Sequence, residues 1–142
     1  MNSQPQLSPR FDFALLVLRI ASAVVFLYHG SAILFGAFGG PGPVAFAGYM
    51  HAPAVVGYLV GLAQVAGGIA VLTGVLQRVG TVCLMIVMLG AIFLVHLPHG
   101  FSVAKNGYEF ALTELLIALA LFLTGPGAYS LNPVLPAAWR KL

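Results

Sequence analysis

The stretch FALLVLRIASAVVFLYHGSAILF, residues 13–35, decides the fold class. It contains one arginine, Arg19, one histidine, His29, and no acidic residue. A helix that crosses a bilayer needs about 20 mostly apolar residues, so this stretch predicts a membrane-spanning helix. Arg10 precedes it as in a signal peptide, but the run is too long for an h-region and lacks a small-x-small cleavage site. We therefore expect the helix to be retained.

Composition supports the same class for the whole chain. The 142 residues are 61% hydrophobic and 6% charged, with a mean hydropathy of +1.03, whereas soluble domains carry about 25% charged residues. The net charge of +3 comes from six basic residues that are spread singly, so no nucleic-acid-binding patch is expected. Cys83 is the only cysteine, which excludes an internal disulfide, a Cys-x-x-Cys redox pair and a cysteine-based zinc site.

Four apolar stretches have the length or composition of a membrane span. They predict an all-α integral membrane protein, a four-helix bundle with up-down-up-down topology in one domain over residues 1–142. The dipeptide QR between the second and third spans is short enough to make them antiparallel neighbours. The proline-rich tail, 125–142, is predicted to lie at the membrane interface. The predicted spans are 13–35, 53–76, 79–97 and 108–124.

Charge distribution predicts the orientation of this bundle. Four spans place both termini on one side of the membrane, together with Arg10, Arg78, Arg140 and Lys141, while Lys105 lies on the other. Basic residues concentrate on the cytoplasmic side of membrane proteins. We therefore expect cytoplasmic termini, with the first and third connections on the outer side, which is the periplasm in a bacterium.

Polar residues of the first span share one helix face. Arg19, Ser22, Phe26, His29 and Ile33 follow one another at spacings of 3, 4, 3 and 4. Arg19 lies about 9 Å from the cytoplasmic end, so it can extend to the headgroups, which we favour, or face inward and pair with an acid or an anionic headgroup. His29 lies in the outer half, where it can hydrogen-bond to a neighbouring helix, relay protons or contact a ligand.

One face of the second span carries Gly57, Gly61, Gln64 and Gly68. Small residues allow another helix to approach closely, and a glutamine at mid-depth can hydrogen-bond across that contact. This pattern indicates helix packing more than it indicates function.

Two acids and a second histidine add to the polar content of the outer half. His96 ends the third span, and Glu109 and Glu114 begin the fourth, at the same level as His29. Such a cluster suits protonation of a reduced small molecule, a quinone headgroup site or a purely structural network, and the residues alone do not choose between them. A haem held by His29 and His96 is disfavoured, since two histidines reach similar depths by chance, and neither a metal nor a covalently bound cofactor is expected.

Four segments together resemble one known family. They are LRIASAVVFLYHGSAILFG, GGIAVLTGVLQR, HLPHGF and GYEFALTELLIALALFLTGPGAYSLN, and they extend from about Leu15 to Asn132. Their order and spacing are similar to those of the DoxX family of small four-helix bacterial membrane proteins. Arg19, His29 and Gly30 match the family's first motif, and His96, Tyr108 and Glu109 match later positions.

The chain also departs from this family's pattern. Ile33 stands where many members carry lysine, Gln64 where many carry glutamate, and Ala128 and Asn132 replace charged residues of the last motif. A mechanism that needs a buried Lys–Glu pair between the first two helices is therefore not expected.

The resemblance implies redox work in the membrane, because members are linked to quinone-coupled oxidation of reduced sulfur compounds and to oxidative-stress complexes with soluble partners. Our first hypothesis is a subunit of a quinone-linked oxidoreductase that receives electrons from a partner subunit. His29 and Glu109 would handle protons, and the quinone-binding residues would be His96, Tyr108, Glu114 and Gln64. The alternatives are a non-catalytic accessory subunit and a small-solute transporter that works as a homo-oligomer.

Overall fold

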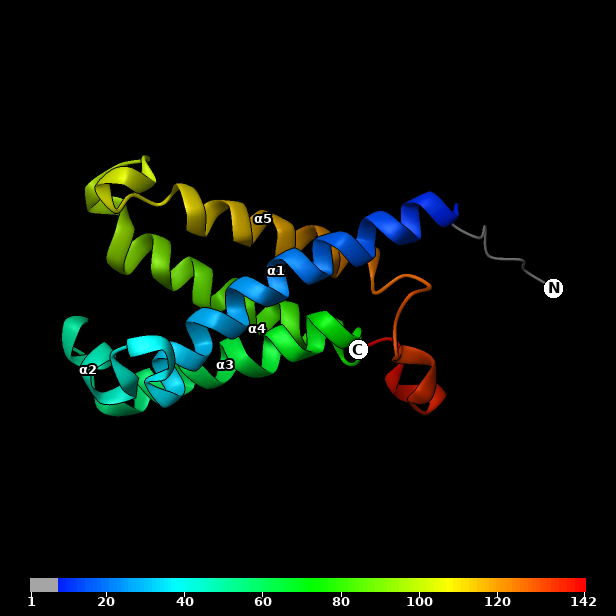
Figure 1. The fold of residues 1–142 in the computed structure, drawn as a ribbon, viewed down its shortest axis with the longest axis horizontal. Helices are drawn as coiled ribbons and strands as arrows, with labels where there is room; N and C mark the ends of the chain where they lie inside the picture. The colour runs from blue at the N-terminus through cyan, green and yellow to red at the C-terminus, as the bar shows by residue number, and fades with distance from the viewer. Residues whose placement is uncertain (1–7) are drawn as a thin grey trace.

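The computed structural model describes residues 8–142, and within that range the chain forms helices and turns but no strand. This confirms the all-α prediction. A π-helical segment, Ala91–His96, extends α4, and short 3₁₀ turns follow it. The α-helices are α1 Pro9–Phe35, α2 Gly42–Tyr49, α3 Ala54–Thr73, α4 Gln77–Gly90 and α5 Glu109–Thr124 (Figure 1).

Three helical segments are long and apolar enough to cross a membrane, as an integral membrane protein requires. They are α1, α3 and the continuous segment Gln77–His99 that begins with α4. α5 is as apolar as these but has 16 residues, which give a length of about 24 Å. The predicted count of four spans therefore depends on α5, which is too short to count as a span by length alone.

The connection between α3 and α4 differs from the predicted QR dipeptide. Gly74 ends α3 with a φ of 76° and donates its N–H to the Ala70 carbonyl, and Leu76 also has a positive φ. Gln77 and Arg78 are instead the first residues of α4, and the buried Gln77 side chain donates a hydrogen bond to the Leu121 carbonyl of α5. The turn over residues 74–76 is one residue longer than predicted, and α3 and α4 still pack as neighbours.

The long connection after α1 contains a helix that the sequence analysis missed. α2 begins near Pro41 and Pro43 and packs on the start of α3. A Cβ atom on Gly57 would lie 1.9 Å from the Pro43 carbonyl oxygen, so glycine is required for this approach.

The helices converge at one end of the molecule and spread apart at the other (Figure 1). At the converging end, Gly67 and Gly80 let α3 and α4 approach closely, since Cβ atoms there would lie 2.7 Å from Leu84 and 2.6 Å from Ala70. At the spreading end, α2 and the connection after α4 stand apart, and α1 meets α5 over a short stretch only. We call these the closed end and the open end.

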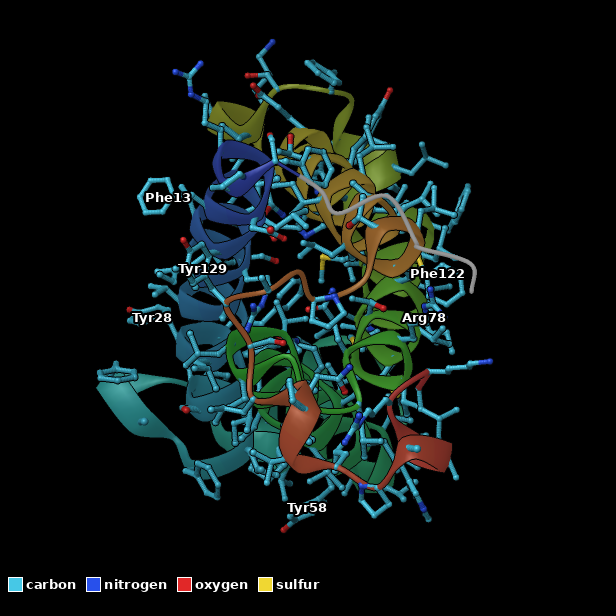
Figure 2. The ribbon with its side chains drawn as sticks, turned by 90° about the vertical axis from the view of Figure 1, so that its right-hand side faces the viewer. Phe13, Tyr28, Tyr58, Arg78, Phe122 and Tyr129 are labelled. Carbon is cyan, nitrogen blue, oxygen red and sulfur yellow. The ribbon has the colours of Figure 1, made fainter. Side chains whose placement is uncertain are left out.

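The tail after α5 folds across the closed end, as Figure 2 shows from that side. We call residues 125–142 the strap. The Leu131 N–H donates to the Thr73 carbonyl at 2.8 Å, and the Val79 N–H donates to the Leu142 carbonyl at 3.0 Å. The strap is therefore fastened to the turn between α3 and α4, and its predicted place at the membrane interface remains a prediction.

Candidate functional site

A cavity of about 600 Å³ lies between the helices at the open end. Ligand sites in proteins have volumes of roughly 300–1,000 Å³ and mostly apolar walls with a few polar groups, and this cavity has both features. Residues of all five helices and of the π-helical segment line it, among them Phe26, Ile33, Phe46, Leu59, Ile86 and Leu94. The side chains that bring polar atoms or sulfur to it include His29, Gln64, Cys83 and His96.

His29 brings an imidazole from α1 to this cavity. Its ring lies between Tyr28, with centroids 5.4 Å apart, and Phe110 of α5, with centroids 6.1 Å apart. Among residues 8–142 the imidazole forms no hydrogen bond, so packing through a bond to a neighbouring helix does not account for it. Its nitrogens are available to a ligand.

The residue after His29 is a glycine, Gly30, because α1 packs closely against α3 at this position. A Cβ atom there would lie 2.8 Å from the Gln64 Cβ and 2.9 Å from the Val65 nitrogen of α3. α1 and α3 therefore touch at Gly30, which brings His29 and Gln64 to the same cavity.

The glycine face of α3 packs against α1, as the helix-packing interpretation of that face requires. Cβ atoms on Gly61 and Gly68 would lie 2.9 Å from Leu34 and 3.0 Å from Leu27. Gln64 lies between these contacts and is only 4% exposed, with its side chain among those that line the cavity.

His96 reaches the cavity from the last residue of the π-helical segment. A π-helix is wider than an α-helix and is often found at functional sites, and here Leu94, Val95 and His96 all line the cavity. The His96 Nδ1 atom lies 2.8 Å from the Asn106 carbonyl oxygen. Because a carbonyl can only accept, Nδ1 carries the hydrogen, and in the neutral ring Nε2 is an acceptor.

Glu109 and Tyr108 do not line the cavity. The Glu109 Oε2 atom accepts a hydrogen bond from the Val103 N–H at 2.9 Å, and the Tyr108 ring makes an edge contact with Phe101. Both side chains stabilise the loop that carries Asn106, the partner of His96. The structure thus separates Glu109 from the histidines with which the sequence grouped it.

Glu114 lies in the core beside the cavity. It is 5% exposed, and its Oε2 atom accepts a hydrogen bond of 2.8 Å from the Ser22 hydroxyl of α1. Phe26, one turn after Ser22, and Ala111, one turn before Glu114, both line the cavity. The carboxyl group is therefore one helical turn from the cavity wall and links α1 to α5.

Arg19 lies at the closed end and faces inward, as the second of its two predicted environments requires, but its expected acidic partner is wrong. It is 1% exposed, so it does not extend to the headgroups, and it pairs with backbone oxygens instead of an acid. Its Nε atom donates to the Val71 carbonyl at 2.7 Å and Nη2 donates to that of Leu72, while Nη1 donates to the Pro126 and Tyr129 carbonyls. The last carbonyls of α3 lack partners within the helix and carry its negative dipole end, which suits a cation.

Two positions that depart from the family pattern are found together in the cavity. Ile33 and Gln64 both line it, and neither side chain is charged. The cavity wall therefore carries no ionised group at these two positions.

Three buried polar residues, Asp12, Gln77 and Thr81, were not predicted to be buried. Asp12 accepts a hydrogen bond from the Ala128 N–H at 2.9 Å, and its spacing of seven residues from Arg19 places it on the same helix face, which is the signal that could have found it. Gln77 was assigned to a connection because it is polar. Across residues 8–142, no group of three or more histidine, cysteine or acidic residues is arranged to hold a metal ion.

Comparisons with known proteins agree with this architecture. The DoxX family model matches residues 14–97. The chain is 28% identical over 123 residues to "Putative oxidoreductase CatD" of Bacillus subtilis (strain 168), covering 87% of each chain. It is 33% identical over 137 residues to "Inner membrane protein YqjF" of Escherichia coli (strain K12), covering 90% of this chain and 96% of that one. No solved structure matches. The chain therefore belongs to the DoxX family of membrane proteins.

Proposed function

We propose that this protein is an inner-membrane subunit of a quinone-linked oxidoreductase and that the open-end cavity binds the quinone headgroup. The observation that carries the proposal is the convergence of His29, Gln64 and His96 on one large apolar cavity. A quinone ring is flat and apolar, with an oxygen at each of two opposite positions, so it needs such walls and few polar partners. The names of the two relatives, an oxidoreductase and an inner membrane protein, support the class and the location.

Each polar group has a chemical task in this proposal. The Gln64 amide donates a hydrogen bond to a quinone oxygen, and the His29 imidazole donates to or accepts from the other oxygen as protons are exchanged. The His96 Nε2 atom accepts a hydrogen bond from a hydroxyl of the reduced form. Glu109 and Tyr108 act through the loop that fixes His96, and electrons come from a partner subunit, since the chain has no motif for an electron-transfer cofactor.

The proposal includes the four-span topology with cytoplasmic termini. α5 would complete the up-down-up-down bundle as a short fourth span, and Arg10, Arg78, Arg140 and Lys141 would lie on the cytoplasmic side. The cavity would then lie in the outer half of the membrane.

The glycines of α3 bear on the alternative, a non-catalytic accessory subunit. That role would use glycine faces to pack against partner helices. Gly57, Gly61, Gly67 and Gly68 all touch α1, α2 or α4 of this chain instead. The observation supports the ligand-binding proposal over the accessory one.

Blocking the cavity tests the proposal directly. Gly90 lines the cavity, has a helical backbone, and has no atom within 4 Å of a Cβ placed there, so the Cβ of Gly90→Phe meets open space and its ring takes up room beside the cavity. Gly48→Phe is the matched control, because Gly48 is also helical with open space but does not line the cavity. We expect protein purified in mild detergent from quinone-containing membranes to lose extractable quinone in Gly90→Phe and to keep it in Gly48→Phe. Equal quinone content in both variants and the wild type would overturn the proposal.

A further inference from the structure

The strap holds positive charge at a fixed place on the closed end. Arg78 donates from Nη1 to the Lys141 carbonyl at 3.1 Å and from Nε to the Phe122 carbonyl at 3.3 Å. Arg140 donates from Nε to the Leu135 carbonyl at 2.8 Å. The bond to the Lys141 carbonyl places Arg78 beside the end of the strap that carries Arg140 and Lys141, and all three residues are exposed. Figure 2 shows Arg78 at this end beside Phe122.

No acidic side chain is available to neutralise these cations. The sequence contains three acids. Asp12 is buried and accepts the Ala128 N–H, and Glu109 and Glu114 are at the open end and in the core. The Leu142 carboxylate, whose oxygen accepts the Val79 N–H, offsets at most one of the three cations. The cluster therefore keeps a net positive charge and attracts an anion from outside the chain.

Apolar side chains beside the cations identify the surroundings of that anion. Trp139, Val134 and Leu142 of the strap are 53%, 82% and 44% exposed. Tryptophan and other apolar side chains next to arginine and lysine are typical of segments that lie at the boundary between headgroups and acyl chains. Arg78 is also the second residue of a membrane-spanning segment, so the cluster is at the level where a span ends.

We propose that the strap and Arg78 form a binding site for the headgroup of an anionic phospholipid, with the phosphate on Arg78, Arg140 and Lys141 and the acyl chains beside Trp139. Arginine suits phosphate because its planar guanidinium offers several donors at once. This inference does not depend on a quinone in the cavity. Its failure would leave the proposed function untouched.

Lipid selectivity of the full-length protein in mild detergent is the test. Native mass spectrometry would count bound phosphatidylglycerol and phosphatidylcholine at increasing salt, with soluble glycerol phosphate as a third arm. We expect phosphatidylglycerol to be preferred, less so at high salt, and glycerol phosphate alone to bind weakly. Each cation near an anionic surface contributes about fivefold in affinity, so Arg140→Gln combined with Lys141→Gln should weaken phosphatidylglycerol binding about 25-fold.

Two further variants distinguish charge from fold. Arg140→Lys loses the guanidinium bonds within the strap but keeps the charge, so it should retain most of the preference. Lys105→Gln removes a cation from the opposite end and should change nothing. Equal binding of the two lipids by the wild type, or an unchanged preference in the double variant, would overturn the site. Binding of glycerol phosphate as tight as that of the lipid would overturn its assignment to the membrane.

Discussion

The two ends of the helix bundle use polar side chains in opposite ways. At the closed end, Arg19 donates four hydrogen bonds to backbone carbonyls and Asp12 accepts one from the strap. At the open end, His29 and Gln64 face a cavity, and the His29 ring forms no hydrogen bond within residues 8–142. Polar groups that are bonded to the backbone hold a structure together, whereas polar groups left free beside a cavity can bind something else. The difference predicts which substitutions change stability and which change ligand content.

The largest effect on stability is expected from Arg19→Met. Removing the guanidinium leaves the Val71, Leu72, Pro126 and Tyr129 carbonyls without their donor in a buried place, and such losses cost about 1–3 kcal/mol for each group that stays unpaired. We expect the free energy of unfolding in detergent to fall by roughly 3 kcal/mol or more, measured by denaturant titration. A loss below about 0.5 kcal/mol, the size of an ordinary surface substitution, would mean that the closed end does not depend on Arg19.

Gly30→Ala should have the next largest effect on stability, and it should change ligand content as well. The new methyl group meets the Gln64 Cβ at 2.8 Å and the Val65 nitrogen at 2.9 Å, and overpacking of this kind costs about 1–3 kcal/mol. Because α1 and α3 must move apart, extractable quinone should also fall.

Gly90→Ala is the matched control for this substitution. The residue also lines the cavity and is helical, but a methyl group there meets open space, so we expect stability to rise by about 0.5–1 kcal/mol through helix propensity. Equal changes in the melting temperature of the two variants would contradict the close contact at Gly30.

Ser22→Ala should destabilise the protein by about 1 kcal/mol. It removes the hydroxyl that donates to the Glu114 Oε2 atom, and a buried carboxyl group without that donor is costly. Ser22→Ala in a Glu114→Leu background should cost less, because the acceptor is then gone. A double-mutant cycle on unfolding free energies measures the coupling, and additive effects would show that the hydrogen bond contributes nothing to stability.

The smallest effect on stability is expected from His29→Ala, which should stay within about 0.5 kcal/mol because the ring forms no hydrogen bond inside the described chain. Quinone content should nevertheless fall about fivefold to tenfold, the equivalent of one lost hydrogen bond. Quinone extraction and thermal melting on the same preparation test both statements. A variant that is destabilised but keeps its quinone would show that His29 supports the fold and does not bind the ligand.

The sequence predicted the features that depend on neighbouring residues, and it failed for features that depend on contacts between distant residues. Apolar stretches predicted the all-α membrane class, and the glycine spacing in α3 predicted a close contact with another helix but did not identify α1 as that helix. The turn at Gly74 was misplaced because Gln77 is polar yet buried, which only its bond to α5 explains. Arg19 was misjudged for the same reason, since its partners lie 52 to 110 residues away. The sequence could not predict which of the candidate residues line the cavity, because depth along a helix does not show which face an acid such as Glu109 presents.

The π-helical segment has a consequence for how relatives of this protein are compared. A π-helix accommodates one residue more than an α-helix of the same span, so removing one residue from Ala91–His96 would restore a regular helix. Because the segment takes up the extra residue locally, the helix on either side keeps its direction, and His96 would stay near its present place after the deletion. A relative that lacks one residue near position 91 can therefore still bring this histidine to the cavity. A single gap at that point would mark the change from π-helix to α-helix and not the loss of the site.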